Sequence, residues 1–349
     1  MRLFSSCKAA VVGGAVANAA TSAKEEVCEK EVNQPSELPG SPSDLMPTLY
    51  LNHGGGPMPV LGQQPEVAEF LKAYGNKFNK NPPEAVVVVT AHWEDSVVSV
   101  STGSSHSLMF DYSGFPSESY RLKYPAPGHP KVANEVLRLL KNAGISARGD
   151  DRRGWDHGTF IPLLCMFDFL LPVFGVLPAC AVIVFRRDPR RSHWSYSYVL
   201  STLCQIPVVQ VSLVRGQDAK QHLAIGAALR PLRERNVLIV GSGASFHNMM
   251  YFFSSGGTKK VGQGHATAWA GWLQKTVTDP ALSAEDRMAT LANWHKAPSA
   301  YDCQPRGRAE HLMPLFVIAG TALGQQGTAV GEKYNSMMGL KINQFEWTN

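Results

Sequence analysis

A chain of 349 residues is long enough for one large α/β domain or for two smaller domains. Its composition, with 44% hydrophobic and 17% charged residues, is ordinary for a globular protein that buries a substantial core. The net charge of +5 is small, and Lys and Arg are scattered except within residues 186–191, which argues against a nucleic-acid partner. The six cysteines form no C-x-x-C pair, so unpaired thiols in a reducing compartment are expected.

The first 46 residues differ from the rest of the chain and are predicted to form a disordered or targeting extension. Residues 1–24 contain Arg2, Lys8 and Lys24, no acidic residue and many Ala, Ser and Gly. Such a start is typical of a mitochondrial presequence, of a weak signal peptide or of an untargeted disordered extension. We expect the cytoplasm as the compartment if the extension is untargeted, with the mitochondrion as the alternative if it is a presequence.

From residue 47 onward, short apolar runs alternate with amphipathic helical segments, which is the pattern of a mainly parallel sheet with helices on its faces. Hydrophobic periodicity predicts strands at 48–51, 85–90, 207–213 and 237–240, and helices at 66–78, 131–143, 220–233, 267–277, 283–294 and 312–323. The expected fold is a single α/β domain over residues 47–349, a three-layer sandwich with a central, mostly parallel or mixed sheet flanked by helices.

One stretch interrupts this alternation. Residues 167–185 are almost wholly apolar, with one Asp and two prolines, and a basic run follows at 186–191. The length approaches that of a membrane span, but internal prolines weaken a helix, so a membrane span is the minority interpretation. We therefore expect an atypical insertion at residues 168–205 in an otherwise continuous domain.

Five histidines have chemically suggestive neighbours, and most of them fall where a predicted strand ends. His53 and His92 follow the first two strands, His247 follows the strand at 237–240, His311 precedes the helix at 312–323, and His157 lies beside an aspartate. Imidazole is the commonest neutral metal ligand and exchanges protons near neutral pH. Open α/β sheets bind ligands at the ends of their strands. The pattern predicts a metal-dependent enzyme, although a buried core histidine remains the alternative for His92.

Other functional motifs fit the sequence poorly. The segment Gly241-Ser-Gly243 lacks the lysine of a P-loop, the third glycine of a dinucleotide fingerprint and the spacing of a nucleophile elbow. There is no H-E-x-x-H metalloprotease helix, and no cysteine lies near the five histidines, which argues against a closed structural zinc site. The other six histidines are assigned to the surface or to packing.

Taken in order, the motifs resemble the 4,5-DOPA extradiol dioxygenase-like family, within the class III (protocatechuate 4,5-dioxygenase beta-subunit-like) ring-cleavage enzymes. The matching segments span residues 47–345 and include His53-Gly-Gly-Gly-Pro-Met58, Thr90-Ala-His-Trp-Glu94, Asp111-Tyr-Ser-Gly-Phe-Pro116, Gly154-Trp-Asp-His-Gly158 and Glu310-His-Leu-Met-Pro-Leu315.

The resemblance implies a role for each of the five histidines. His53, His92 and His311 would hold the metal, which is non-haem Fe(II) in the family, with Zn(II) as the alternative. His247 would be the acid/base beside the metal, or a fourth ligand where zinc is bound, and His157 would contact the substrate. The implied reaction is extradiol cleavage of a catechol-type, DOPA-like aromatic by O2. A zinc-dependent hydrolase and a non-catalytic binding protein are the alternatives, and no oligomeric state is predicted.

Two features depart from the family pattern. Relatives commonly carry another histidine near Gln304, so substrate contacts there are in doubt. Relatives also have a short acidic turn where residues 168–205 stand, so we hypothesise that this segment is a translated intron or an alternative exon. Spliced transcripts joining residue 167 to residue 206 through a few residues would support that hypothesis, and a continuously supported reading frame would contradict it. Trp93, Tyr124 and Phe246 are candidates for packing against the substrate ring, with the hydrophobic core as their alternative place.

Overall fold

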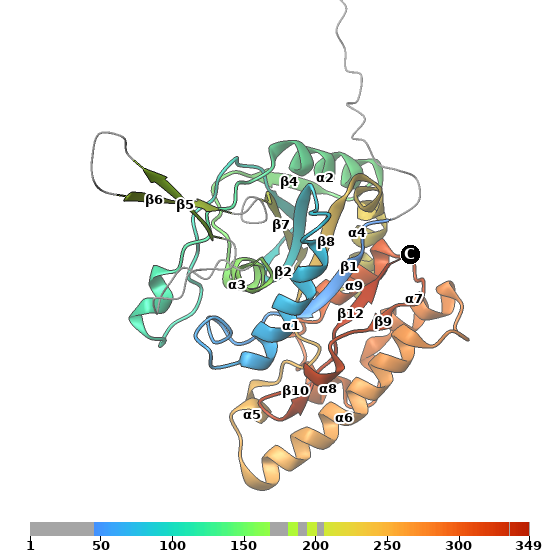
Figure 1. Ribbon diagram of the computed structural model, residues 1–349. Coiled ribbons are helices and arrows are strands. Elements are labelled where there is room, and N and C mark those ends of the chain that lie inside the picture. The colour runs from blue at the N-terminus through green and yellow to red at the C-terminus, as the bar shows by residue number, and fades with distance from the viewer. Residues whose placement is uncertain (1–44, 168–180, 188–193, 201–205, 335, 349) are drawn as a thin grey trace, which may run out of the picture. The chain divides into compact units, whose positions relative to one another are not determined.

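The computed structural model describes residues 45–348, apart from residues 168–180, 188–193, 201–205 and 335 (Figure 1). The central sheet in this part of the chain is mixed and has the strand order β4-β3-β7-β2-β8-β1-β12-β9. Its strands are β1 (Thr48–Asn52), β2 (Ala85–Asp95), β3 (Val98–Ser101), β4 (Ala147–Asp150), β7 (Val208–Val214), β8 (Val237–Gly243), β9 (Thr328–Ala329) and β12 (Phe345–Trp347).

The middle of the sheet is parallel and its outer parts are mixed. Strand β2 pairs in parallel with both β7 and β8, and β8 pairs in parallel with β1. Antiparallel pairing joins β3 to β7 and β12 to β1, and β3 and β4 are parallel to each other. The carboxyl ends of β1, β2 and β8 therefore meet at one edge of the sheet.

Helices cover both faces of this sheet (Figure 1). The longer helices are α1 (Pro65–Gly75), α2 (Pro130–Asn142), α3 (His157–Met166), α4 (Ala219–Leu229), α6 (Gly256–Thr278), α7 (Ala284–Ala292) and α9 (Met313–Thr321). The short elements are η1 (Asn76–Phe78), η2 (Ser117–Arg121), η4 (Arg230–Arg235), α5 (Met249–Phe252), η5 (Trp294–Lys296), α8 (Ala300–Cys303), η6 (Glu332–Tyr334), β10 (Ser336–Met337) and β11 (Leu340–Lys341).

The valine run of β2 shows why the fold has three layers. Successive side chains of a strand point to opposite faces of the sheet. Val86 and Val88 belong to the apolar cluster shared with α1 and α3, whereas Val87 and Val89 belong to the cluster shared with α2, α4 and α9. All four valines are fully buried. An uninterrupted apolar run is thus what a strand needs when helices cover both of its faces.

Glycines allow α4 and α9 to pack unusually closely. A Cβ atom on Gly226 would lie 1.9 Å from the carbonyl oxygen of Val317, and one on Gly320 would lie 2.1 Å from that of Leu223. Every residue of α9 is buried, so this helix forms part of the core beneath the sheet. The close packing holds α9 against α4, and α9 begins two residues after His311.

The predicted three-layer α/β fold is confirmed, with shifts at the ends of several elements. Strand β2 continues to Asp95 and β8 to Gly243, both beyond their predicted ends, and α6 begins eleven residues before the predicted helix. The sequence pattern missed the short strands β3, β4, β9 and β12. These strands are two to four residues long, which is too short for a hydrophobic period to be recognised.

Part of the atypical segment 168–205 forms an antiparallel pair of strands, β5 (Ala181–Arg187) and β6 (Trp194–Leu200). The remainder of that segment, and nearly all of the expected extension at residues 1–46, lie outside the described residues. No helix in the described part of the chain is long and apolar enough to span a membrane.

Candidate metal centre

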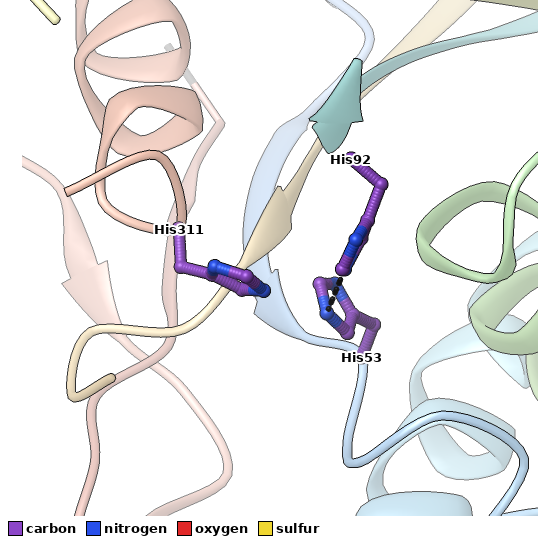
Figure 2. Close-up of side chains that lie close together, drawn as sticks. All are labelled: His53, His92 and His311. Atoms are coloured by element: carbon purple, nitrogen blue, oxygen red, sulfur yellow. Dashed lines mark hydrogen bonds between the residues drawn. The ribbon is translucent and has the colours of Figure 1, made fainter. Parts of the chain in front are cut away.

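Three histidines that are distant in the sequence converge at the carboxyl edge of the sheet (Figure 2). His53, His92 and His311 each offer one ring nitrogen, and these nitrogens lie within 4.8 Å of one another. The ring centroids are 5.0 Å apart for His53 and His92, 5.3 Å for His53 and His311, and 4.9 Å for His92 and His311. His53 and His311 are buried, and His92 is partly buried.

Parallel pairing brings the first of these histidines to the edge. His53 directly follows β1, and its backbone N–H donates to the carbonyl of Gly243 at the end of β8. The chain then turns through Gly54 and Gly56, whose φ angles are +83° and +57°. Residues other than glycine are strained at such φ angles, so these glycines allow the loop to fold back over the site.

His311 is fixed by hydrogen bonds from its backbone to the sheet. Its carbonyl oxygen accepts from the hydroxyl of Tyr50 at 3.1 Å and from the backbone N–H of Ala244 at 2.9 Å. A Cβ atom on Gly243 would lie 2.1 Å from the same oxygen, so a glycine is needed for the loop before α9 to approach β8 this closely.

His92 lies inside a strand and not after one, which corrects the expected boundary. Pairing between β2 and β8 ends at Thr90, opposite Ser242. Strand β2 nevertheless continues beside β7, with a shift of register between Val89 and Glu94. The apolar run ends at Thr90, and two residues later His92 lines the site, while pairing with β7 keeps this part of β2 extended. An irregularity of this kind redirects side chains, and His92 is the residue that it turns toward His53.

The hydrogen bonds behind His53 determine which of its nitrogens is free. Its Nδ1 lies 2.9 Å from the hydroxyl of Ser242, and that hydroxyl donates its proton to the carbonyl oxygen of Gly158. A serine hydroxyl has one proton, so it must accept from Nδ1–H of His53. The lone pair of the ring is then on Nε2, which faces His92.

His92 and His311 also have acceptors behind them. Nδ1 of His92 lies 3.4 Å from Oδ2 of Asp111, and Nδ1 of His311 lies 3.1 Å from Oε1 of Glu310. A carboxylate behind a metal-binding histidine orients the ring and makes it a stronger ligand. The three rings are therefore arranged to present Nε2 to a common point.

Burial keeps these imidazoles neutral. It lowers the pKa of His53 and of His311 well below the ordinary value, and the neighbouring histidines lower both further. Burial, followed by repulsion from His157, lowers the pKa of His92 to about 3, although Asp111 opposes that shift. Each ring thus keeps a lone pair at neutral pH instead of a proton.

The spacing of the nitrogens fits a shared cation. Nε2 of His53 and Nε2 of His92 are 3.2 Å apart. Two ligands at about 2.0–2.1 Å from one ion would be about 2.9–3.4 Å apart at bond angles between 90° and 109°. Neutral nitrogen donors without a thiolate suit zinc or non-haem iron, so the residues present fit a divalent transition metal.

His157 extends this cluster, and Asp111 holds it in place. Oδ1 of Asp111 accepts from the backbone N–H of His157 at 2.9 Å and from its Nδ1 at 2.8 Å. The His157 ring centroid is 4.0 Å from that of His92 and 5.3 Å from that of His53. Although burial raises the pKa of Asp111, the hydrogen bond and charge of His157 outweigh it, so that pKa lies below its usual value.

Asp111 is a residue of this cluster that the sequence analysis did not single out. It lies in a motif that carried the family resemblance, but nothing local to that motif indicates a histidine partner 46 residues away. Asp156, the neighbour of His157, has a different role: its side chain caps α3 and accepts from Thr90 at 2.8 Å.

His247 completes the set of five. Its ring stacks on that of His311, with centroids 3.5 Å apart and planes at 21°. Burial, followed by the charge of Arg308, lowers the pKa of His247 to about 4. Its Nδ1 is buried without a hydrogen-bond partner, 3.5 Å from Oε1 of Glu310. A neutral ring with an unused nitrogen can take up or release a proton.

All five histidines line one cavity of about 370 Å³, a size within the range of small-molecule sites. Its aromatic walls come from Tyr112, Phe115, Phe252 and Phe253. The three aromatic residues considered from the sequence (Trp93, Tyr124 and Phe246) are buried in the core and do not line this cavity.

Gln304, which stands where relatives commonly carry a histidine, is also buried. Its Nε2 donates to the carbonyl oxygens of Ala244 at 3.1 Å and Ser245 at 2.9 Å, so it supports the loop after β8.

Comparison with known proteins identifies what the chain resembles. Residues 46–192 match the family described as the catalytic LigB subunit of aromatic ring-opening dioxygenase, and the match ends within the atypical segment. The chain is 31% identical to dioxygenase tasH of Hapsidospora irregularis, over 87% of this chain and 86% of the relative. It is 30% identical to the 4,5-DOPA dioxygenase extradiol of Beta vulgaris, over 81% of this chain and 89% of the relative.

The fold has a counterpart among solved structures. A crystal structure of an uncharacterized protein from Escherichia coli K12 superimposes with a TM-score of 0.58 at 21% identity, covering 86% of this chain and 99% of the other. That likeness supports the α/β sandwich.

Proposed function

Because this chain belongs to the LigB-type family of extradiol ring-opening dioxygenases, we propose that it cleaves the ring of a catechol with O2 at a metal held by His53, His92 and His311. The observation that carries the proposal is the convergence of three neutral imidazoles, two of them buried and one partly buried, within 4.8 Å of one another in a cavity of about 370 Å³ with aromatic walls. Neutral ligands would leave a divalent metal its full charge and open coordination positions.

The metal would supply one part of the chemistry. When bound, Fe(II), with Zn(II) as the alternative, would make a coordinated catechol more acidic and hold it in reach of O2. Neighbouring side chains would position the substrate and move its protons.

We assign His247 as the acid/base. Its Nδ1 is directed toward Glu310, which leaves Nε2, on the other side of the ring, to accept a catechol proton and return it during ring opening. Its low pKa keeps it unprotonated before substrate arrives. A positioned histidine of this kind typically contributes about 10²–10⁴-fold to a rate.

His157 is assigned to substrate positioning. An ionised Asp111 can only accept a hydrogen bond, so it retains the proton of His157 on Nδ1 and leaves Nε2 as an acceptor for a substrate hydroxyl. Asp111 thereby connects a proposed metal ligand, His92, to a proposed substrate contact, His157.

Reconstitution under anaerobic conditions tests the proposal. Protein loaded with Fe(II), mixed with a catechol and then with ¹⁸O2, is expected to consume one O2 per catechol and to incorporate both oxygen atoms into a ring-opened product. Activity that needs zinc but no oxygen would support a hydrolase instead, and absence of metal binding would support a non-catalytic binding protein. The names of the relatives do not favour either alternative.

A further inference from the structure

The cavity has two chemically different ends. One end is the group of five histidines. The other end, formed by the loop after His53, the loop before η2, the segment around α5 and the β10–β11 hairpin, is lined by large apolar side chains: Met58, Phe115, Phe252, Phe253, Met337 and Met338. A substrate ring bound at the histidines would direct its substituent into this apolar end.

The polar groups between the two ends are already engaged. The hydroxyl of Tyr112 donates to the carbonyl oxygen of Ser119 at 2.8 Å, so the face of its ring, and not its oxygen, is available to a ligand. Oε1 of Gln64 accepts from the backbone N–H of Gly55 at 2.8 Å. The amide of Asn52 contacts the sulfur of Met337 at 3.2 Å.

Charged side chains are missing from the described residues that line the cavity, among which there is no Lys, Arg, Asp or Glu. Asp111 and Glu310 lie behind the histidines and contact their Nδ1 atoms. Arg308 is close enough to His247 to lower its pKa but is not part of the lining. An ammonium or carboxylate carried into this space would lose water without gaining a charged partner, which disfavours its binding.

Apolar side chains remain exposed where the cavity opens. Phe253 is 75% exposed, Met249 47% and Met338 40%. Met338 and Gly339 form the two-residue turn between β10 and β11, with φ angles of +52° and +76°, and this turn holds the methionine at the opening. Exposed apolar groups gathered at one place indicate a binding surface, and methionine adapts its shape to varied apolar ligands.

We infer that the substrate is a catechol whose ring carries an uncharged, apolar substituent and not the charged amino-acid side chain of DOPA. The inference rests on the proposed function for the catechol end of the ligand and on the charge-free lining for the other end. It predicts that affinity increases with the length of an alkyl substituent until the substituent covers the exposed residues at the opening of the cavity. We call these residues, Met249, Phe253 and Met338, the rim.

Calorimetric binding under anaerobic conditions to the full chain loaded with Zn(II) tests this directly, because no ring can be opened without O2. The ligands are 4-methyl-, 4-ethyl- and 4-butylcatechol, 3-(3,4-dihydroxyphenyl)propionate and L-DOPA. Each buried methylene is expected to tighten binding about threefold to fourfold. The two charged ligands should bind more weakly than 4-ethylcatechol. Affinity that does not change with chain length, or L-DOPA binding as tightly as 4-butylcatechol, would overturn the inference.

Introduced charge at the rim provides a second test. Phe253→Arg and Met249→Arg each place a cation at an exposed rim position, so folding should be preserved. They should improve binding of the propionate relative to 4-butylcatechol by up to about fivefold, the strength of an exposed ion pair. The matched control is Val261→Arg on α6, which is 54% exposed and does not line the cavity, and it should leave the ratio unchanged. Equal shifts in all three variants would contradict the inference.

Failure of the proposed function would look different. If the Fe(II) protein opens no catechol ring while the zinc protein still binds alkylcatechols with the expected increase per methylene, the dioxygenase assignment is wrong and the apolar specificity stands. If rings are opened but the charged ligands bind and react as well as the alkylcatechols, the dioxygenase assignment stands and the apolar specificity is wrong.

Discussion

The rings at the histidine end of the cavity are held by polar side chains behind them, whereas several apolar side chains at the other end are exposed to solvent. His53, His92, His157 and His311 each have an acceptor at Nδ1, from Ser242, Asp111 or Glu310. At the other end, the side chains of Phe253 and Met338 are exposed, and the hydrogen bond from the N–H of Phe253 to the carbonyl oxygen of Met249 involves only the backbone. The difference teaches that reaction chemistry needs fixed atoms, while selection of an apolar substituent needs only shape and absence of charge.

The largest expected effect comes from removing a ligand. His92→Ala should abolish binding of Fe(II) and Zn(II), and with it all ring opening, because two imidazoles cannot hold the ion as three do. Metal content after dialysis, measured by elemental analysis, checks this, with His295→Ala as a control on an exposed histidine outside the cavity. Full metal occupancy in the His92 variant would exclude His92 as a ligand.

Loss of His247, the proposed acid/base, should lower activity nearly as much, but without loss of the metal. His247→Ala is expected to retain the metal and to lower kcat by about 10²–10⁴-fold, since only proton transfer is removed. Metal content and single-turnover kinetics on the same preparation separate the two effects. A variant that loses its metal would instead place His247 among the ligands, as expected for a zinc-loaded site.

A smaller effect is expected from a change of Asp111, whose carboxylate lies behind the proposed ligand His92. Asp111→Asn keeps the size of the side chain but removes the charge that orients His92 and His157. Metal affinity or activity should decrease about 10–100-fold. Asp95→Asn, which removes an aspartate hydrogen-bonded to Ser99 and Arg148 away from the cavity, is the matched control and should change neither. If the Asp111 and Asp95 variants have equal metal affinity and activity, Asp111 does not support the site.

The last prediction concerns stability as a function of pH, and it distinguishes the histidine end of the cavity from the apolar end. His92 and His247 have pKa values lowered to about 3 and about 4 in the folded chain. An unfolded histidine has a pKa of about 6.5 and therefore binds more protons than the folded one between those values. Stability of the metal-free protein should thus fall as pH decreases from about 6.5 toward 4, by about 1.4 kcal/mol per pH unit for each such histidine.

Urea unfolding at pH 7, 6 and 5 measures this slope. His247→Ala should make the slope shallower, whereas Phe253→Ser at the apolar rim, which adds no titratable group, should leave it unchanged. An unaltered slope in the histidine variant would mean that His247 is not held neutral in the folded chain.

Much of this molecule could be predicted from local patterns. The apolar run at 85–90 had to be a strand covered on both faces, and the helices at 131–143 and 220–233 followed from their period. The five histidines could be singled out because a polar, titratable residue beside an apolar strand or helix is unusual. For His53, His92 and His247, convergence then follows from parallel pairing, which brings the carboxyl ends of β1, β2 and β8 to one edge, whereas His157 lies at the start of α3 and His311 two residues before α9.

What the sequence alone determined is therefore the identity of the chemical groups and the elements that carry them. Only the tertiary structure decided which nitrogen of each ring is free, because Ser242, Asp111 and Glu310 reach the histidines through space. It also decided that Trp93 and Phe246 are core and that Phe115 and Met338 line the cavity. The hydrophobic period of a sequence segment indicates which side chains of one helix or strand are buried. A cavity is lined by side chains from several elements, and their positions relative to one another are not encoded in the period of any single element.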